Sequence, residues 1–84
     1  MNHHTTGDFW ACYKSLPEAV RVLADRNFAR LKNDPNHPSL HFKKIGRLWS
    51  VRVGITHRAL AVRDGDDLIW FWLGSHADYD HLVR

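Results

Sequence analysis

Residues 49–62 carry the pattern that most constrains the fold of this chain. From Trp49 to Val53, apolar residues alternate with Ser50 and Arg52, which is the period of two of a half-buried β-strand. A second strand is expected over residues 57–62, after a short turn. Because successive side chains on a strand point to opposite faces, we expect Arg52 on the face opposite the apolar residues.

The first third of the chain predicts two helices. Apolar residues recur at helical spacing from Phe9 to Leu16, and a second helix is expected from about Pro17, since proline is tolerated in a first turn. The prolines and asparagines of residues 33–38 end this helix. Its apolar stripe consists of Val20, Leu23, Ala24, Phe28 and Leu31.

The rest of the chain predicts strands. An extended segment is expected over residues 40–45, and Asp64-Gly65-Asp66 is a hairpin signal because Asp-Gly suits the positive φ angles of tight turns. Residues 68–73 are apolar on both faces, which is typical of a strand in the centre of a covered sheet. Residues 78–84 are interpreted as a short helix or a tail.

Helices followed by strands indicate the α+β class. We expect one domain, residues 1–84, in which an N-terminal helical hairpin packs on a small, mostly antiparallel sheet of three to four strands. Residues 1–7 are expected to form a flexible tail. The sheet residues expected to pack against the second helix are Trp49, Val51, Leu60, Val62, Ile69 and Phe71.

Composition and charge narrow the function classes. A single cysteine, Cys12, excludes an internal disulfide framework. No apolar run approaches the roughly 18–20 residues of a membrane-spanning helix, and residues 1–8 lack the apolar region of a signal peptide. We therefore expect a cytoplasmic protein with no membrane partner. The net charge of +3 permits contact with nucleic acid without requiring it.

Basic side chains gather around the predicted strands. Arginine suits phosphate because its planar fork donates two parallel hydrogen bonds, and lysine adds a point charge. Phe42, Trp49 or Trp72 could stack a nucleobase if exposed. The alternative is a set of ordinary solvated charges, although Arg52 lies within an apolar strand and needs a solvent or partner face. The basic residues are Lys43, Lys44, Arg47, Arg52 and Arg58, with His41, His57 and His76 nearby.

A second polar group, residues 74–81, follows the last predicted strand. Its His76, Tyr79 and His81 belong to residue types that act as general acids or bases when geometry brings them to a reacting group. A metal site is not expected, because no Cys or Glu completes a known ligand spacing, and no cofactor-binding motif is present. The alternative is a helix cap made by Asp78, with surface polar residues behind it.

Taken together, these motifs resemble the RelE/ParE superfamily of bacterial toxins, the toxin halves of type II toxin–antitoxin pairs. The resemblance spans roughly residues 8–83. It implies a helical hairpin on an antiparallel sheet and a cognate antitoxin as partner, although the opening strand of the family is missing or very short here. The motifs that carry it are His37-Pro-Ser-Leu-His-Phe-Lys-Lys, Trp49-Ser-Val-Arg-Val-Gly, His57-Arg-Ala-Leu-Ala, Gly65-Asp, Trp70-Phe-Trp-Leu-Gly-Ser-His and Tyr79-Asp.

The resemblance implies more than one activity. RelE-like members cleave messenger RNA on the ribosome without a metal, through attack of the ribose 2′-hydroxyl on the adjacent phosphate, whereas ParE-like members inhibit DNA gyrase. We expect the ribosome-dependent endoribonuclease, with gyrase inhibition or a domain that only binds its antitoxin as alternatives. Matched to the family motifs, the catalytic candidates are Arg52, Arg58, His76 and Tyr79. The RNA-binding candidates are Lys43, Lys44, Arg47 and His57.

Overall fold

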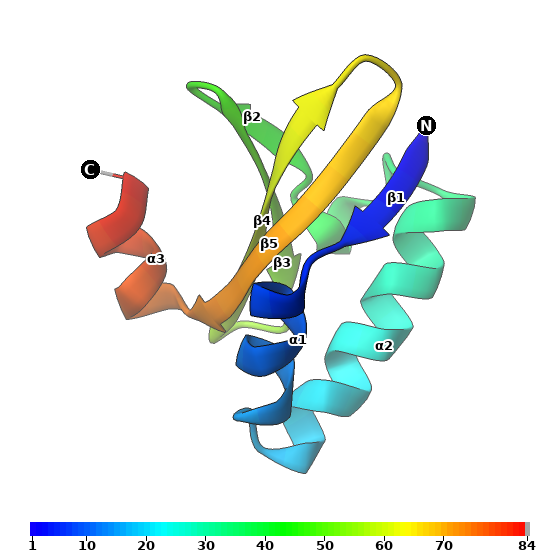
Figure 1. Cartoon of the computed structure of the whole chain (residues 1–84). Helices are drawn as coiled ribbons and strands as arrows, with labels where there is room; N and C mark the ends of the chain where they lie inside the picture. The colour runs from blue at the N-terminus through cyan, green and yellow to red at the C-terminus, as the bar shows by residue number, and fades with distance from the viewer. Residues whose placement is uncertain (84) are drawn as a thin grey trace.

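A computed structural model describes residues 1–83. Helices lie on both sides of one sheet (Figure 1). The elements are β1 (Asn2–Thr5), α1 (Gly7–Lys14), α2 (Glu18–Asn33), a 3₁₀ turn (Pro38–Leu40), β2 (Lys43–Ile45), β3 (Leu48–Val53), β4 (His57–Asp64), β5 (Asp67–Ser75) and α3 (His76–Val83). The predicted α+β class and the helical hairpin are confirmed. Arg84, the end of the predicted C-terminal segment, lies outside the described residues. Within the described part of the chain, no helix combines the length and the apolar character needed to cross a membrane.

The helix ends follow the sequence signals. The side chain of Thr6 caps α1, because its Oγ1 accepts a hydrogen bond of 3.1 Å from the Phe9 amide. Helix α2 begins directly after Pro17 and ends before the segment rich in proline and asparagine. The predicted hairpin at Gly65 is confirmed, with a φ of 60° that glycine adopts without strain.

The sheet has five strands in the order β1-β5-β4-β3-β2. Strands β2 to β5 pair antiparallel, each with the next along the chain. The predicted central position of residues 68–73 is confirmed, because β5 lies between β4 and β1. The sheet therefore has five strands, where three or four were expected.

The additional strand is β1, for which a flexible tail over residues 1–7 was expected. That expectation is wrong for Asn2–Thr5, which pair in parallel with β5 from Asp67 to Trp70. The sequence Asn-His-His-Thr lacks apolar alternation, so periodicity gives no signal for a strand. A strand that is apolar on both faces is typical of the centre of a sheet, so the sequence of β5 was an indirect signal that another strand pairs with its second edge.

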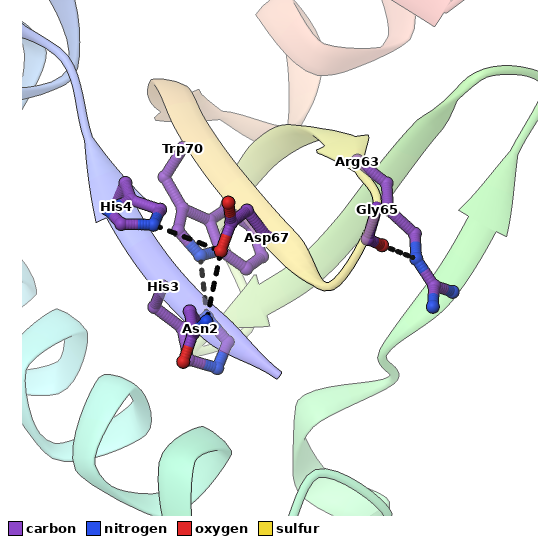
Figure 2. Close-up of polar contacts among 7 residues, drawn as sticks. All are labelled: Asn2, His3, His4, Arg63, Gly65, Asp67 and Trp70. Atoms are coloured by element: carbon purple, nitrogen blue, oxygen red, sulfur yellow. Dashed lines mark hydrogen bonds and ion pairs between the residues drawn. The ribbon is translucent and has the colours of Figure 1, made fainter.

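Polar side chains of β1 and β5 contact one another (Figure 2). Asn2 donates a 3.1 Å hydrogen bond to Asp67, and His4 lies 3.2 Å from the same carboxylate oxygen. These two contacts lower the pKa of Asp67. On the other side of the strand, Nε1 of Trp70 donates a 3.1 Å hydrogen bond to Nδ1 of His3. Partial burial and the nearby N-terminal charge lower the pKa of His3.

The core lies between the sheet and helices α1 and α2. Strand β3 contributes Val51 and Val53 to it, and Trp49 packs at its margin, as the alternation predicts. Most of the predicted stripe of α2 is confirmed, whereas Phe28 stays partly exposed at the rim. The buried residues of this core are Leu16, Leu31, Leu40, Val51, Val53, Ala59, Ala61, Leu68, Trp70 and Leu73.

The predicted phase of β4 is wrong. Leu60 and Val62 were expected to face the helices, but Ala59 and Ala61 do so. Since the sequence Ala-Leu-Ala-Val is apolar at every position, periodicity cannot choose between the two faces. The structure directs the small alanines toward the helices, where α1 and α2 pack, and turns Leu60 and Val62 to the other face.

The predicted phase of β5 is also wrong, because a β-bulge interrupts its alternation. The pairing with β4 skips one residue between Trp70 and Trp72, which leaves Phe71 without a partner. As a result Trp70 and Leu73 both belong to the core, although strict alternation would separate them. Ile69 and Phe71, which were expected in this core, lie outside it.

Candidate active site on the outer face

Strand register sorts the predicted site residues between two faces. Directly paired residues of antiparallel strands project to the same face. Arg52 pairs with Arg58, which pairs in turn with Gly74, and Lys43 pairs with Ser50. All five positions lie on the face opposite α1 and α2. We call this the outer face; it also carries Leu60, Trp72 and the apolar residues Leu48, Val62 and Ile69.

Helix α3 brings two further candidates to Arg58. In Figure 1, α3 lies on the other side of the sheet from α2. The Nε of Arg58 lies 3.4 Å from Nδ1 of His76, and its guanidinium carbon lies 5.0 Å from the centre of the Tyr79 ring. The His76 and Tyr79 rings are stacked, with centres 5.9 Å apart and planes at 15°. Nε2 of His76 faces Asp80 at 3.8 Å.

Arg52 is held by one contact to its backbone and one to its side chain. Its backbone carbonyl accepts a 2.9 Å hydrogen bond from the side-chain amide of Asn27, which is buried on α2. Its guanidinium Nη1 lies 3.3 Å from Nε2 of His41. His41 has a φ of 44°, in the left-handed region, at the end of the 3₁₀ turn. Arg52 therefore has a fixed strand position and a histidine neighbour on the outer face.

Three RNA-binding candidates do not join this group. Lys44 pairs with Trp49 and His57 pairs with Val53, so both project toward the other face. Nδ1 of His57 lies 2.8 Å from the hydroxyl of Thr56. Arg47 is exposed in the turn between β2 and β3. The outer face thus unites Lys43, Arg52, Arg58, His76 and Tyr79 and leaves the others apart.

The outer face carries buried polar groups and paired positive charges that lower the stability of the folded protein. Arg58 is only 7% exposed, and its Nη1 is buried without a hydrogen-bond partner among residues 1–83. Ser50 is fully buried, and its hydroxyl has no hydrogen-bond partner in the described part of the chain. Two arginines directly opposite each other on adjacent strands repel, and no ion pair within the described residues involves either one. Such an arrangement favours an anion as ligand, because an anion can accept the hydrogen bonds that arginine donates and offset the repulsion between the two positive charges.

Sequence reasoning named the two arginines but gave no role to two neighbours of Arg52, which are His41 and Asn27, or to Asp80 beside His76. His41 counted only as an available side chain, Asp80 had no assigned role, and Asn27 was overlooked inside a helix. Asn27 carried a usable signal, since an amide amid the apolar residues of α2 needs a buried hydrogen-bond partner. The contact between His41 and Arg52 depends on the 3₁₀ turn, which the sequence did not predict.

Comparison with known proteins identifies the family. A model of the ParE-like toxin domain matches residues 18–81. The chain belongs to the ParE-like toxin family. The matched region of this ParE-like toxin extends from α2 into α3 and so includes the arginines of the outer face. A search of curated protein sequences gives no significant match.

Solved structures of related toxins have the same fold as this ParE-like toxin. A chain of the RelB–RelE antitoxin–toxin complex from Methanococcus jannaschii aligns with a TM-score of 0.74 and 18% identity, over 96% of this chain and 99% of its own. The YoeB/ParE toxin from Agrobacterium tumefaciens aligns with a TM-score of 0.66 and 16% identity, over 90% and 99%. A chain of the RelBE2 toxin–antitoxin complex from Mycobacterium tuberculosis gives 0.64 and 16%, over 89% and 96%. The predicted RelE/ParE resemblance is confirmed.

Proposed function

We propose that this ParE-like toxin, a toxin of the type II class, cleaves messenger RNA on the ribosome. The observation that supports this most is the pair formed by Arg52 and the buried Arg58, whose Nη1 has no partner within residues 1–83. A buried donor without a partner costs about 1–3 kcal/mol of stability, and more when it is charged. Proteins keep such costs mainly at sites where a ligand offsets them.

The two arginines suit a phosphate whose charge increases during reaction. When the 2′-oxygen of RNA attacks the adjacent phosphorus, negative charge builds up on the phosphoryl oxygens. Donors that are already in place stabilise this charge without having to reorganise, and each is worth on the order of 10²–10³ in rate. Arg52 and Arg58 would therefore contribute more to the transition state than to binding of the RNA.

His76 is the proposed general acid. If Nδ1 accepts the hydrogen bond from Nε of Arg58, the neutral ring carries its proton on Nε2. In the proposed step, the bond from the 2′-oxygen to phosphorus forms and the bond to the 5′-oxygen breaks. Nε2 of His76 donates its proton to the departing 5′-oxygen, and the proton of the 2′-hydroxyl passes to water. The side chain of His76 is half-exposed, so RNA can approach its ring.

The RNA path is proposed to follow the outer face. Lys43 lies on this face toward β2 and can contact the backbone on one side of the scissile phosphate. Trp72 pairs with Leu60 on the same face and offers a flat surface for a base. Lys44, Arg47 and His57 lie off this path, so we propose that they contribute only to the general attraction of RNA.

A cognate antitoxin is the proposed protein partner. The outer face combines basic residues with apolar ones, and Val62 there is 39% exposed. An acidic segment with apolar residues, folding as it binds, would cover both parts. The solved structures with this fold include the antitoxin–toxin complex of Methanococcus jannaschii, which supports the proposal.

Gyrase inhibition is the second candidate, and the name of the matched family model, ParE-like, favours it. An inhibitor has no need of a phosphate site prepared for a growing charge. The two candidates therefore differ in what they require of Arg58: the nuclease needs its guanidinium at the reacting phosphate, whereas an inhibitor needs it only if gyrase contacts this face.

Purified toxin added to ribosomes stalled on a defined message tests the proposal. Cleavage by the wild-type protein is expected, with a loss of at least 10²-fold for Arg58→Ala. Arg63→Ala is the matched control, since Arg63 lies on the same strand and donates a 2.8 Å hydrogen bond to the carbonyl of Gly65 (Figure 2). A wild-type protein that leaves the message intact and blocks DNA supercoiling by gyrase would replace the nuclease with the second candidate.

A further inference from the structure

The ring of Tyr79 contacts the guanidinium group of Arg58. Tyr79 lies on α3 and is 4% exposed, and the Arg58 guanidinium lies over the face of its ring. The same ring stacks on His76, whose Nδ1 meets Nε of Arg58. These three side chains form one cluster, and the ring of Tyr79 supplies its packing surface.

The strands alone do not place the Arg58 guanidinium. On one side, the cross-strand partner is Arg52, which repels it. On the other side, the partner is Gly74, which has no side chain. A Cβ at position 74 would lie 2.4 Å from the Trp72 indole, so this position is closed to a larger residue. An arginine side chain is flexible and loses rotamer freedom when it is fixed in one position. Within the described residues, the polar and aromatic contacts of the Arg58 guanidinium come from α3.

We propose that Tyr79 is a positioning residue, whose ring holds the Arg58 guanidinium in place at the proposed phosphate site. This inference deepens the proposed function and rests on it for its effect on cleavage. The inference gives Tyr79 and His76 different roles. His76 transfers a proton, whereas Tyr79 acts through its ring and does not need its hydroxyl for cleavage. The placement of Arg58 by Tyr79 is a property of the free protein and can be measured without RNA.

Two substitutions distinguish positioning from proton transfer. Tyr79→Phe keeps the ring and removes the hydroxyl, so cleavage should stay within about twofold of wild type with an unchanged pH profile. Tyr79→Leu removes the ring, so cleavage should fall by about 2- to 30-fold, the range that the loss of a cation–π contact gives. If Tyr79→Phe loses as much activity as Tyr79→Leu, or its pH profile changes, the hydroxyl takes part in the chemistry and the inference is wrong.

A measurement on the free protein keeps the inference testable if the message is not cleaved. The Nε–Hε signal of Arg58 in a ¹⁵N NMR spectrum, assigned by its loss in Arg58→Lys, should be shifted by the aromatic ring in wild type and Tyr79→Phe. In Tyr79→Leu the signal should move toward the position of a free arginine, and its response to added inorganic phosphate should weaken. An unchanged signal in a folded Tyr79→Leu protein would overturn the inference. If Tyr79→Leu does not fold, Tyr79→Met places a longer, flexible apolar side chain at this position without the ring and serves for the same comparison.

Discussion

The side chain of Asn27 links the helical layer to the strand that carries Arg52. Its Nδ2 donates a 2.9 Å hydrogen bond to the Arg52 carbonyl, and the residue is 8% exposed. Asn27→Ala removes the donor, leaves that partly buried carbonyl without this partner and opens a small space between α2 and β3. Because Arg52 lies directly opposite Arg58, a looser β3 also disturbs the pair that is proposed to bind phosphate.

The expected decrease in the free energy of unfolding follows from the cost of leaving a buried polar group without a hydrogen bond. An unmade hydrogen bond to a buried acceptor costs about 1–3 kcal/mol, and alanine returns about 0.5 kcal/mol through its higher helix propensity. The net expected loss is about 0.5–2.5 kcal/mol. In a domain of this size, each kcal/mol corresponds to a fall in Tm of about 4–8 °C. Thermal unfolding followed by circular dichroism at 222 nm measures it directly.

Asn33→Ala is the matched control for this prediction. Asn33 is the last residue of the same helix and is exposed. Its replacement should leave Tm unchanged within about 2 °C. If Asn27→Ala proves as stable as Asn33→Ala, the hydrogen bond to Arg52 does not hold the two layers together, and the account of how Arg52 is placed would be wrong.

Two further predictions concern the rim of the site and the N-terminal strand. Gly74→Ala should displace the Trp72 indole from its position over residue 74, since the new Cβ would lie 2.4 Å from the ring. The expected results are a shift in tryptophan fluorescence and a reduced rate of cleavage. An unchanged fluorescence spectrum would refute the close packing of Trp72 on Gly74. His3 accepts a hydrogen bond from Trp70, and its pKa is lowered in the folded state by burial. The unfolded chain therefore binds a proton first as pH falls below about 6.5, so the free energy of unfolding should decrease from pH 7 toward pH 5. Urea unfolding should show a weaker decrease in His3→Gln and the wild-type decrease in His81→Gln; equal slopes in all three would contradict the role of His3.

The sequence predicted the elements whose signals are local. The period of two in β3, the helical spacing in α1 and α2, and the Asp-Gly turn each depend on neighbouring residues, and all three are confirmed. Arg52 was placed correctly on the face opposite the apolar residues of β3, because alternation within one strand fixes that face. The prediction of a RelE/ParE toxin rested on these same motifs.

The failures involve choices that depend on contacts distant in the sequence. Strand β1 owes its pairing to β5, more than 60 residues away. The alanines of β4 turn inward where the helices pack, and the bulge at Phe71 lies in the pairing of β5 with β4. No local pattern encodes these outcomes. The cluster of Arg58, His76 and Tyr79 likewise depends on where α3 folds back, although its members were all among the candidates.

The chemical ends of the cleaved message test the central claim most directly. Attack by the ribose 2′-hydroxyl leaves a 2′,3′-cyclic phosphate on one fragment and a 5′-hydroxyl on the other, which mass spectrometry of the fragments identifies. The account predicts these ends with wild-type toxin and Arg63→Ala on stalled ribosomes, and at least 10²-fold fewer with Arg58→Ala. Fragments ending in a 3′-hydroxyl and a 5′-phosphate, or equal cleavage by Arg58→Ala, would contradict it.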